Sequence, residues 1–172
     1  GCGMDSHYME NLISKIVSLT EETDPMTLRL ALENSKMLSA DVGIAYDSSY
    51  PEAFEPSNTA RLGRGPAIIK YAGHMGKKGC NDASAEYLAL IRDIFDNADV
   101  YWQTGEYGKI DFGGGGTIAP FAAAYGMEVV DCGVVLLSMH APYELASKAD
   151  IYETYRAYRA FLESGIELRQ YM

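Results

Sequence analysis

The sequence predicts an α/β fold in which a mixed β-sheet lies between layers of helices. Segments with helical hydrophobic spacing alternate along the chain with short apolar runs of strand length. The chain has 172 residues, about one domain, with no internal repeat and no change of composition along its length. Strands that alternate with helices are typical of a three-layer sandwich, because the helices must cover both faces of the sheet.

The first part of the chain predicts two helices, a strand and a loop. Residues 7–19 repeat apolar side chains at helical spacing. Residues 25–37 do so again after the start signal Thr23–Pro25, with proline at its favoured first position. The apolar run at 39–46 predicts a strand. Residues 50–65 carry two prolines and predict a long loop, which in a compact domain is usually functional or a subunit contact.

The remainder predicts an alternation of strands and helices that ends in a long helix. Residues 66–71 predict a strand and residues 73–79 a loop. A helix follows at 83–96, with Asn81–Asp82 as its N-cap. The other predicted elements are a strand at 100–103, a helix at 117–126, strands at 127–131 and 133–138, and a helix at 147–163.

Charge and cysteine content limit the classes of function. Asp and Glu number 24 against 14 Lys and Arg, a net charge of −10, so the clustered cations that nucleic acid requires are missing. No apolar run approaches the ~20 residues of a membrane span, and neither a membrane nor a signal peptide is expected. Three separated cysteines predict free thiols in a reducing, cytoplasmic setting.

His140 is the strongest candidate among three histidines. It directly follows the apolar run 134–137, at the end of a strand where α/β proteins bind their ligands. The competing interpretation is a buried histidine whose hydrogen bonds are satisfied. His7 begins an amphipathic helix and His74 lies in a glycine-rich loop, so both are expected at the surface.

Two aspartates and a lysine also lie at strand ends. Asp41 sits in an apolar run, where a carboxylate is costly to bury unless it is paired, caps an amide or binds a metal. Asp131 either supports another site residue or turns the chain. Lys70 is either solvated or a positive partner for a substrate carboxylate. Histidine and aspartate are zinc ligands, but a zinc site needs three or four protein ligands and the chain offers two good candidates.

Four consecutive glycines, Gly113–Gly116, precede Thr117 at the start of a predicted helix. Their unobstructed N–H groups suit a carboxylate, a phosphate or a substrate carbonyl. The run lacks the lysine of a P-loop and the glycine spacing of a dinucleotide site. A merely flexible turn is the alternative interpretation.

Several motifs in order resemble the M18 family of metalloaminopeptidases. They are Ser39–Asp41, GPAIIK at 65–70, the glycine run ending GGTIAPF, and VVDCGVVLLSMHAPYE at 129–144. The resemblance implies a two-zinc enzyme, with cobalt or manganese as alternative metals, that removes N-terminal residues from peptides. It also implies a homo-oligomer that assembles through dimers into a hollow particle.

The resemblance assigns roles to particular residues. Asp41 would be the acidic ligand of one zinc ion and His140 the histidine ligand of the other. Lys70 matches a lysine that faces the substrate side chain in the aspartyl branch of the family. The loop that contains Gly115, Gly116 and Thr117 matches a wall of the substrate pocket.

The opening GCGMDS resembles the segment directly after the family's glutamate pair, so the general base and the other ligands are expected upstream. Residues 1–172 are therefore expected to be the C-terminal portion of a peptidase catalytic domain, without its upstream half and inserted domain, and inactive alone. Residues 44–47 lack the histidines of the aspartyl branch, which argues against acidic substrates.

Two other classes of function remain open. A non-catalytic binding or assembly module would keep the fold and lack the upstream base and ligands. An anion-binding α/β protein would use the glycine run and would not depend on Asp41 or His140.

Overall fold

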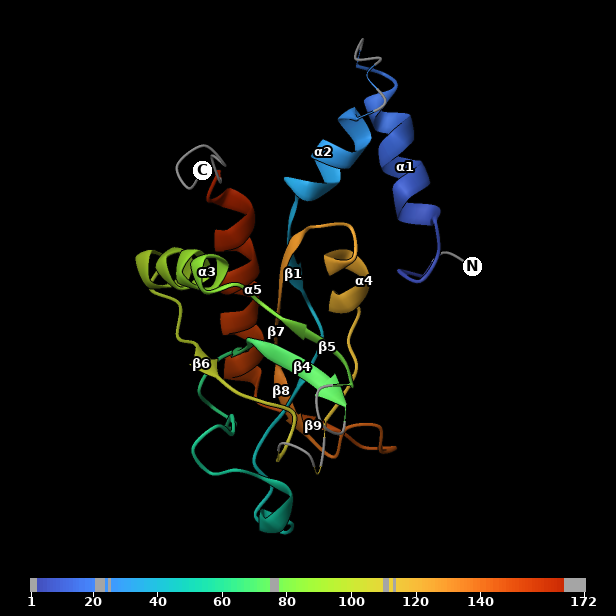
Figure 1. The fold of residues 1–172 in the computed structure, drawn as a ribbon. Helices are drawn as coiled ribbons and strands as arrows, with labels where there is room; N and C mark the ends of the chain where they lie inside the picture. The colour runs from blue at the N-terminus through green and yellow to red at the C-terminus, as the bar shows by residue number, and fades with distance from the viewer. Residues whose placement is uncertain are drawn as a thin grey trace.

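The mixed sheet that the sequence predicts has strand β7 (Glu128–Gly133) in its interior (Figure 1). The computed structural model describes residues 3–20, 24, 26–74, 78–109, 112 and 114–165. β7 lies between β1 (Lys36–Ser39) and β3 (Ala67–Ile69), and β6 (Gln103–Thr104) follows β3 at an edge. The β1–β7 and β3–β6 pairs are parallel, whereas β3 and β7 are antiparallel.

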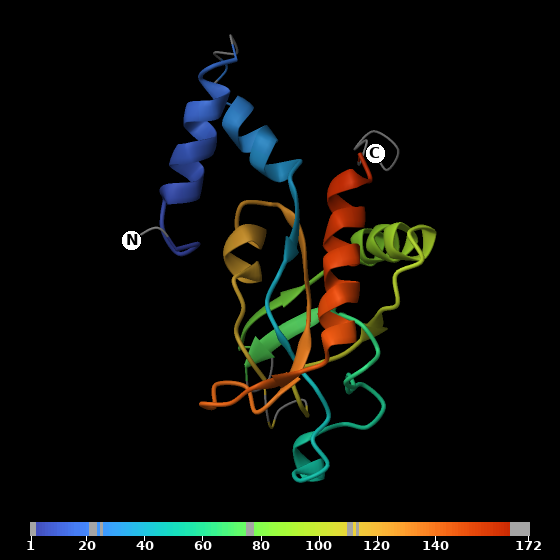
Figure 2. The same ribbon diagram turned by 180° about the vertical axis from the view of Figure 1, so that it is seen from behind.

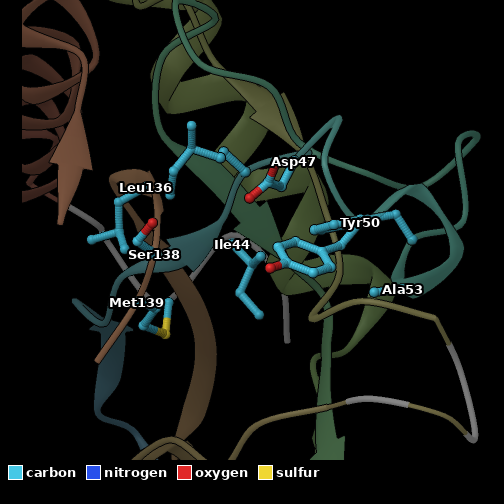
Figure 3. Close-up of a pocket in the computed structure, with 10 residues that line it drawn as sticks. Ile44, Asp47, Tyr50, Ala53, Leu136, Ser138 and Met139 are labelled. Atoms are coloured by element: carbon cyan, nitrogen blue, oxygen red, sulfur yellow. The ribbon is translucent and has the colours of Figure 1, made fainter. Parts of the chain in front are cut away.

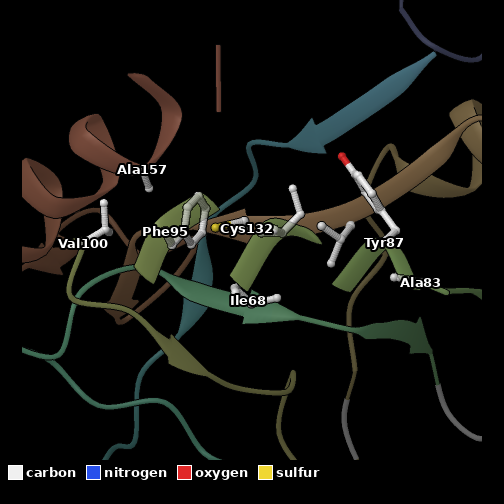
Figure 4. Packing of buried hydrophobic residues seen from close by; sticks show 9 residues of the cluster. Ile68, Ala83, Tyr87, Phe95, Val100, Cys132 and Ala157 are labelled. Atoms are coloured by element: carbon white, nitrogen blue, oxygen red, sulfur yellow. The ribbon is translucent and has the colours of Figure 1, made fainter. Parts of the chain in front are cut away.

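Helices cover one face of this sheet because alternate side chains of β7 point to it. Val130 and Cys132 form a buried cluster with Ile68 of β3 and with helices α3 (Ala85–Asn97) and α5 (Lys148–Glu163) (Figure 4). Burial of each large apolar side chain there stabilises the fold by roughly 1.5–3 kcal/mol.

The other face of β7 packs against α4 (Ala119–Ala123) and α2 (Thr27–Glu33). Val129 shares a buried cluster with Leu32 of α2, and α1 (Tyr8–Val17) contributes only partly buried side chains to it. Helices α1 and α2 lie at one end of the molecule, and α4 lies across the sheet from α5 (Figure 2). Both faces are covered, so the predicted three-layer α/β arrangement is confirmed.

Within the described residues, five short strands lie outside the central sheet. β8 (Val135–Leu137) continues β7, pairs with β2 (Gly43–Ile44) in parallel and pairs with β9 (Leu145–Ala146) in antiparallel. β4 (Tyr71–His74) and β5 (Lys78–Asp82) form an antiparallel pair. The chain therefore switches sheets twice, after β1 and after β7.

Three long predicted helices are confirmed, with ends within two residues of the prediction: α1, α3 and α5. The helix predicted at 25–37 is too long, because Lys36 and Met37 pair with β7 as part of β1. The long loop predicted at 50–65 contains only a 3₁₀ turn at Pro51–Ala53.

The loop predicted at 73–79 is wrong, because its described residues belong to β4 and β5. Glycines at both ends of this stretch suggest a break in structure, and cross-strand pairing overrides that local signal. The predicted cap Asn81–Asp82 is also wrong, since these residues end β5. Ser84 caps α3 instead, and its Oγ accepts a hydrogen bond from the Tyr87 N–H at 3.1 Å.

The predicted free thiol is confirmed for Cys132, which is fully buried, and burial raises its pKa to about 12. The first cysteine, the side chain of Cys80 and most of the Thr23–Pro25 start signal lie outside the described residues. Gly113 and the side chain of His74 do so too. Within the described ranges, no helix is both long and apolar enough to cross a bilayer.

A buried carboxylate fixes the chain where it enters β3. Asp150, in the first turn of α5, is 0% exposed, and its two oxygens accept hydrogen bonds from the N–H groups of Gly63 and Gly65, both at 2.7 Å. Gly65 has φ +78°, and a Cβ there would lie 1.6 Å from the Tyr101 carbonyl oxygen. Only glycine fits this position, and Asp150 holds its backbone against α5.

Replacing Asp150 with asparagine is expected to destabilise the fold by roughly 2–3 kcal/mol, because one buried N–H would then face an amide donor. Urea denaturation of the variant and the wild-type chain measures this loss. Asp47→Asn is the matched control, since the partly exposed Asp47 carboxylate accepts a local hydrogen bond from the Ser49 N–H at 2.8 Å. Equal losses in the two variants would contradict the role given to Asp150.

Candidate functional site

Asp41 lies where the chain leaves the central sheet, between β1 and β2. Its side chain is half-buried, and its Oδ1 accepts a hydrogen bond from the Val42 N–H at 2.8 Å. The Tyr107 hydroxyl donates to the Val42 carbonyl oxygen at 3.1 Å. A Cβ at Gly133 would lie 1.9 Å from the Asp41 carbonyl oxygen, so β7 passes directly beside this segment.

His140 lies in the turn that joins β8 to β9. It is exposed, so the interpretation as a buried histidine is wrong. Its backbone N–H donates to Glu144 Oε1 at 2.6 Å, and no hydrogen bond of its imidazole is found among the described residues. His140 has φ +67° and Ser138 has φ +58°, a left-handed conformation that residues other than glycine rarely adopt.

The structure does not bring Asp41 and His140 into one cluster. Asp41 precedes Gly43, which is level with Val135 of β8, whereas His140 follows the end of β8. The two residues therefore lie beyond opposite ends of the β2–β8 pair. In the described part of the chain, no three His, Cys, Asp or Glu side chains form a group that could hold a metal ion.

The two side chains fit zinc in donor type but not in number. A carboxylate oxygen and an unengaged imidazole nitrogen are both zinc ligands. A complete site requires further donors, which the described residues do not place beside either one. Their assignment as zinc ligands therefore stays a prediction.

The glycine loop is anchored at one end by Thr117. The Thr117 hydroxyl donates to Asp131 Oδ2 at 3.0 Å and accepts a hydrogen bond from the Ala119 N–H at 3.2 Å, next to the start of α4. Gly115 lies against the Tyr107 ring, whereas a Cβ on Gly116 would meet no atom within 4 Å. The loop thus leaves the backbone of Gly116 beside open space.

Asp131 lies inside β7. The sequence predicts a strand that ends at this residue, and that prediction is wrong. It is fully buried and in register with Ser39 of β1, and Asp131 Oδ1 and Ser39 Oγ are without hydrogen-bond partners in the described structure. Burial raises the pKa of Asp131, the hydrogen bond from the Thr117 hydroxyl opposes the shift, and the charge of Asp41 adds to it. The sequence feature that marks Asp131 as a candidate site residue is a carboxylate within an apolar strand.

Lys70 lies away from the glycine loop. It follows β3, and its Nζ forms an ion pair with the Asp82 carboxylate, with both side chains about half exposed. Lys70 lines a cavity of about 200 Å³ together with Ile68 and Leu88, on the α3 side of the sheet. Asp131 and Thr117 lie on the opposite side, so the structure does not place Lys70 beside Thr117.

A pocket of about 310 Å³ adjoins the turn that carries His140. Figure 3 shows Ser138 and Met139 of this turn on one side, Tyr50 and Asp47 on the other, and Ile44 between them. The lining is mainly apolar, and Asp47 is its one charged side chain. A pocket of this size and lining suits an apolar side chain.

Comparisons with known proteins extend over most of the chain. A family model described as Aminopeptidase I zinc metalloprotease (M18) matches residues 1–162. A protein of Clostridium acetobutylicum named "Probable M18 family aminopeptidase 1" is 54% identical over 162 residues, which are 94% of this chain and 35% of that protein. The chain therefore spans about a third of the length of the curated relatives it matches.

Solved structures of M18 aminopeptidases also match most of the chain. The crystal structure of aminopeptidase I from Clostridium acetobutylicum has 54% identity and a TM-score of 0.83, and the match covers 93% of this chain and 34% of that one. An M18 family aminopeptidase from Thermotoga maritima has 39% identity and a TM-score of 0.90, with 95% and 37% covered.

Asp131→Asn is expected to make the metal-free chain less sensitive to pH. The raised pKa means that the native state binds the Asp131 proton more tightly than the unfolded state does. The wild type therefore loses stability as pH rises from about 4 through the raised pKa, by at most about 1.4 kcal/mol per pH unit. The variant lacks this loss. Its free energy of unfolding, relative to that of the wild type, therefore rises across that pH window and then stays constant.

Urea denaturation with a chelator present, at a series of pH values from 4 to 8, measures this difference. Asp5→Asn is the control for the loss of one carboxylate, since Asp5 is exposed. A stability difference between Asp131→Asn and wild type that does not change with pH would contradict the prediction.

Proposed function

The chain belongs to the M18 family of zinc metalloproteases, and on that premise we propose that it is part of an aminopeptidase that removes N-terminal residues from peptides. The observation that carries the proposal is the 54% identity over 94% of the chain to an M18 aminopeptidase. We propose that residues 1–172 are the C-terminal portion of its catalytic domain. The general base and the remaining metal ligands would come from the rest of the full-length polypeptide.

Within that enzyme, Asp41 and His140 are proposed to bind one zinc ion each of a two-zinc site. Zinc, when bound, activates a water molecule and polarises the scissile carbonyl group. The role of Asp41 is supported by its main chain, which packs directly against Gly133 and therefore has a fixed position. The same role for His140 is supported by its exposed imidazole, which makes no hydrogen bond among the described residues.

The glycine loop is proposed to bind the peptide backbone of the substrate. Thr117 holds the loop to β7 through Asp131, and the open space beside Gly116 leaves room for a substrate to approach the main chain. Backbone N–H groups in such a loop suit a substrate carbonyl or carboxylate. Lys70 is proposed to reach the substrate only if its ion pair with Asp82 breaks.

The pocket beside the His140 turn is proposed to bind the side chain of the N-terminal residue. Its mainly apolar lining favours leucine or methionine, and Asp47 disfavours an acidic side chain through like charge. This argument agrees with the absence of the aspartyl-branch histidines at residues 44–47.

We also propose that the protein forms a homo-oligomer and works in the cytoplasm. Tyr8, Leu12, Ile16 and Leu19 are exposed apolar side chains at helical spacing along and just beyond α1. A second subunit would bury such a stripe. The cytoplasmic location rests on the free thiol of Cys132.

In the full-length protein, His140→Ala and Asp41→Ala are each expected to lower kcat/KM by roughly 10²–10³-fold or more, because each removes a ligand from the metal site that stabilises developing charge. Hydrolysis of aminoacyl substrates measures the effect, and chelation followed by zinc addition should abolish and restore activity. His7→Ala is the matched control, since His7 is an exposed histidine that pairs with Glu10. A full-length protein that neither binds zinc nor cleaves peptides would favour the non-catalytic binding module.

A panel of aminoacyl substrates tests the pocket separately. We expect leucine and methionine to exceed aspartate in kcat/KM, and Asp47→Ala to narrow that difference because the like charge is lost. Glu52→Ala, on the neighbouring 3₁₀ turn, is the control for removal of one carboxylate. A preference for aspartate in the wild type would contradict the pocket assignment and leave the aminopeptidase proposal intact.

A further inference from the structure

The turn between β8 and β9 has an unfavourable backbone conformation at two residues. Ser138 has φ +58° and His140 has φ +67°, and neither is a glycine. Side chains with a Cβ are strained in this left-handed region, so the conformation persists only where the surrounding structure maintains it. Strain of this kind is concentrated at functional sites.

Three contacts maintain the turn, two of them made by the backbone alone. The register of β8 with β9, Leu136 opposite Ala146 and Leu137 opposite Leu145, brings the two ends of the turn together. At its start, the Ala141 N–H donates to the Ser138 carbonyl oxygen at 2.9 Å.

The remaining contact comes from Glu144. Its Oε1 accepts the hydrogen bond of the His140 N–H at 2.6 Å, a short distance that fits a charge-assisted hydrogen bond. In the described part of the chain, this is the only hydrogen bond that the Glu144 side chain makes. The carboxylate therefore acts on the main chain of His140 alone.

We propose that Glu144 is a positioning residue for His140. The left-handed backbone conformation determines the direction of the Cα–Cβ bond of His140, and Glu144 holds that conformation through the backbone N–H. Metal-binding histidines are usually oriented by a partner of the second ring nitrogen. No such partner of the His140 ring is found among the described residues, so the backbone contact supplies the orientation here. The inference rests on the proposed function, in which the His140 imidazole binds zinc.

The test compares three Glu144 variants of the full-length protein by zinc dissociation constant, measured in competition with a chromogenic chelator. Glu144→Ala removes the acceptor and is expected to weaken zinc binding by about 10–100-fold. Glu144→Gln keeps an acceptor at the same reach without the charge and should stay within about fivefold of the wild type, because a neutral hydrogen bond is roughly half as strong.

Glu144→Asp keeps the charge but is one methylene shorter, and we expect it to behave like Glu144→Ala. The reverse order, in which the aspartate variant binds zinc well and the glutamine variant does not, would mean that the charge acts directly on the metal. That result overturns the positioning role. Because the glutamine and aspartate variants are the smaller changes, this comparison holds even if Glu144→Ala fails to fold.

A double-mutant cycle separates positioning from general stabilisation of the turn. In the His140→Ala background there is no imidazole to orient, so Glu144→Ala should cause no further loss of zinc affinity. An equal loss in both backgrounds overturns the proposal. Glu163→Ala is the matched control, because Glu163 is exposed and pairs with Arg159 on α5; it should leave zinc affinity unchanged.

The cycle also distinguishes failure of this inference from failure of the proposed function. If the wild type binds no zinc, or binds it equally well after His140→Ala, the proposed function fails and the positioning role fails with it. If His140→Ala weakens zinc binding and Glu144→Ala does not, only the positioning role is overturned.

Discussion

The close approach of two backbone segments at Gly133 determines how the rest of the molecule is arranged. The Asp41 carbonyl oxygen occupies the space that a Cβ on Gly133 would fill. Because Gly133 has no side chain, the chain after β1 and the chain after β7 leave the central sheet side by side and pair again as β2 and β8. This shared exit carries Asp41 at its start and leads to the turn of His140 at its end.

The candidate site divides into a buried part and an exposed part with different physical character. The half-buried Thr117 links the glycine loop to β7 through a hydrogen bond to the buried Asp131 carboxylate. His140 lies on an exposed turn, and the Glu144 carboxylate accepts the hydrogen bond of its backbone N–H. The roles proposed for them differ in the same way: a loop that binds a peptide backbone needs a fixed main chain, whereas a residue that binds a metal needs a free side chain in a fixed direction.

Hydrophobic periodicity predicted the elements whose own residues carry a clear pattern: α1, α3, α5 and the continuous apolar strand β7. It failed where pairing between strands overrides the local pattern, as at Lys36, which pairs with the distant strand β7, and in the hairpin of β4 and β5. At the site, position after an apolar strand singled out His140, and the cost of burial singled out Asp41. The contacts of Asp131 with Thr117 and of Glu144 with His140 depend on tertiary geometry and left-handed backbone, which residue spacing does not show.

The central claim is that this chain supplies zinc ligands to an M18 aminopeptidase. Anomalous diffraction at the zinc edge from crystals of the zinc-loaded full-length protein tests it most directly. The account predicts one zinc ion at about 2.0–2.2 Å from an imidazole nitrogen of His140 and a second zinc ion at a similar distance from a carboxylate oxygen of Asp41. Zinc bound by other residues, with His140 and Asp41 both outside its coordination sphere, would contradict the account.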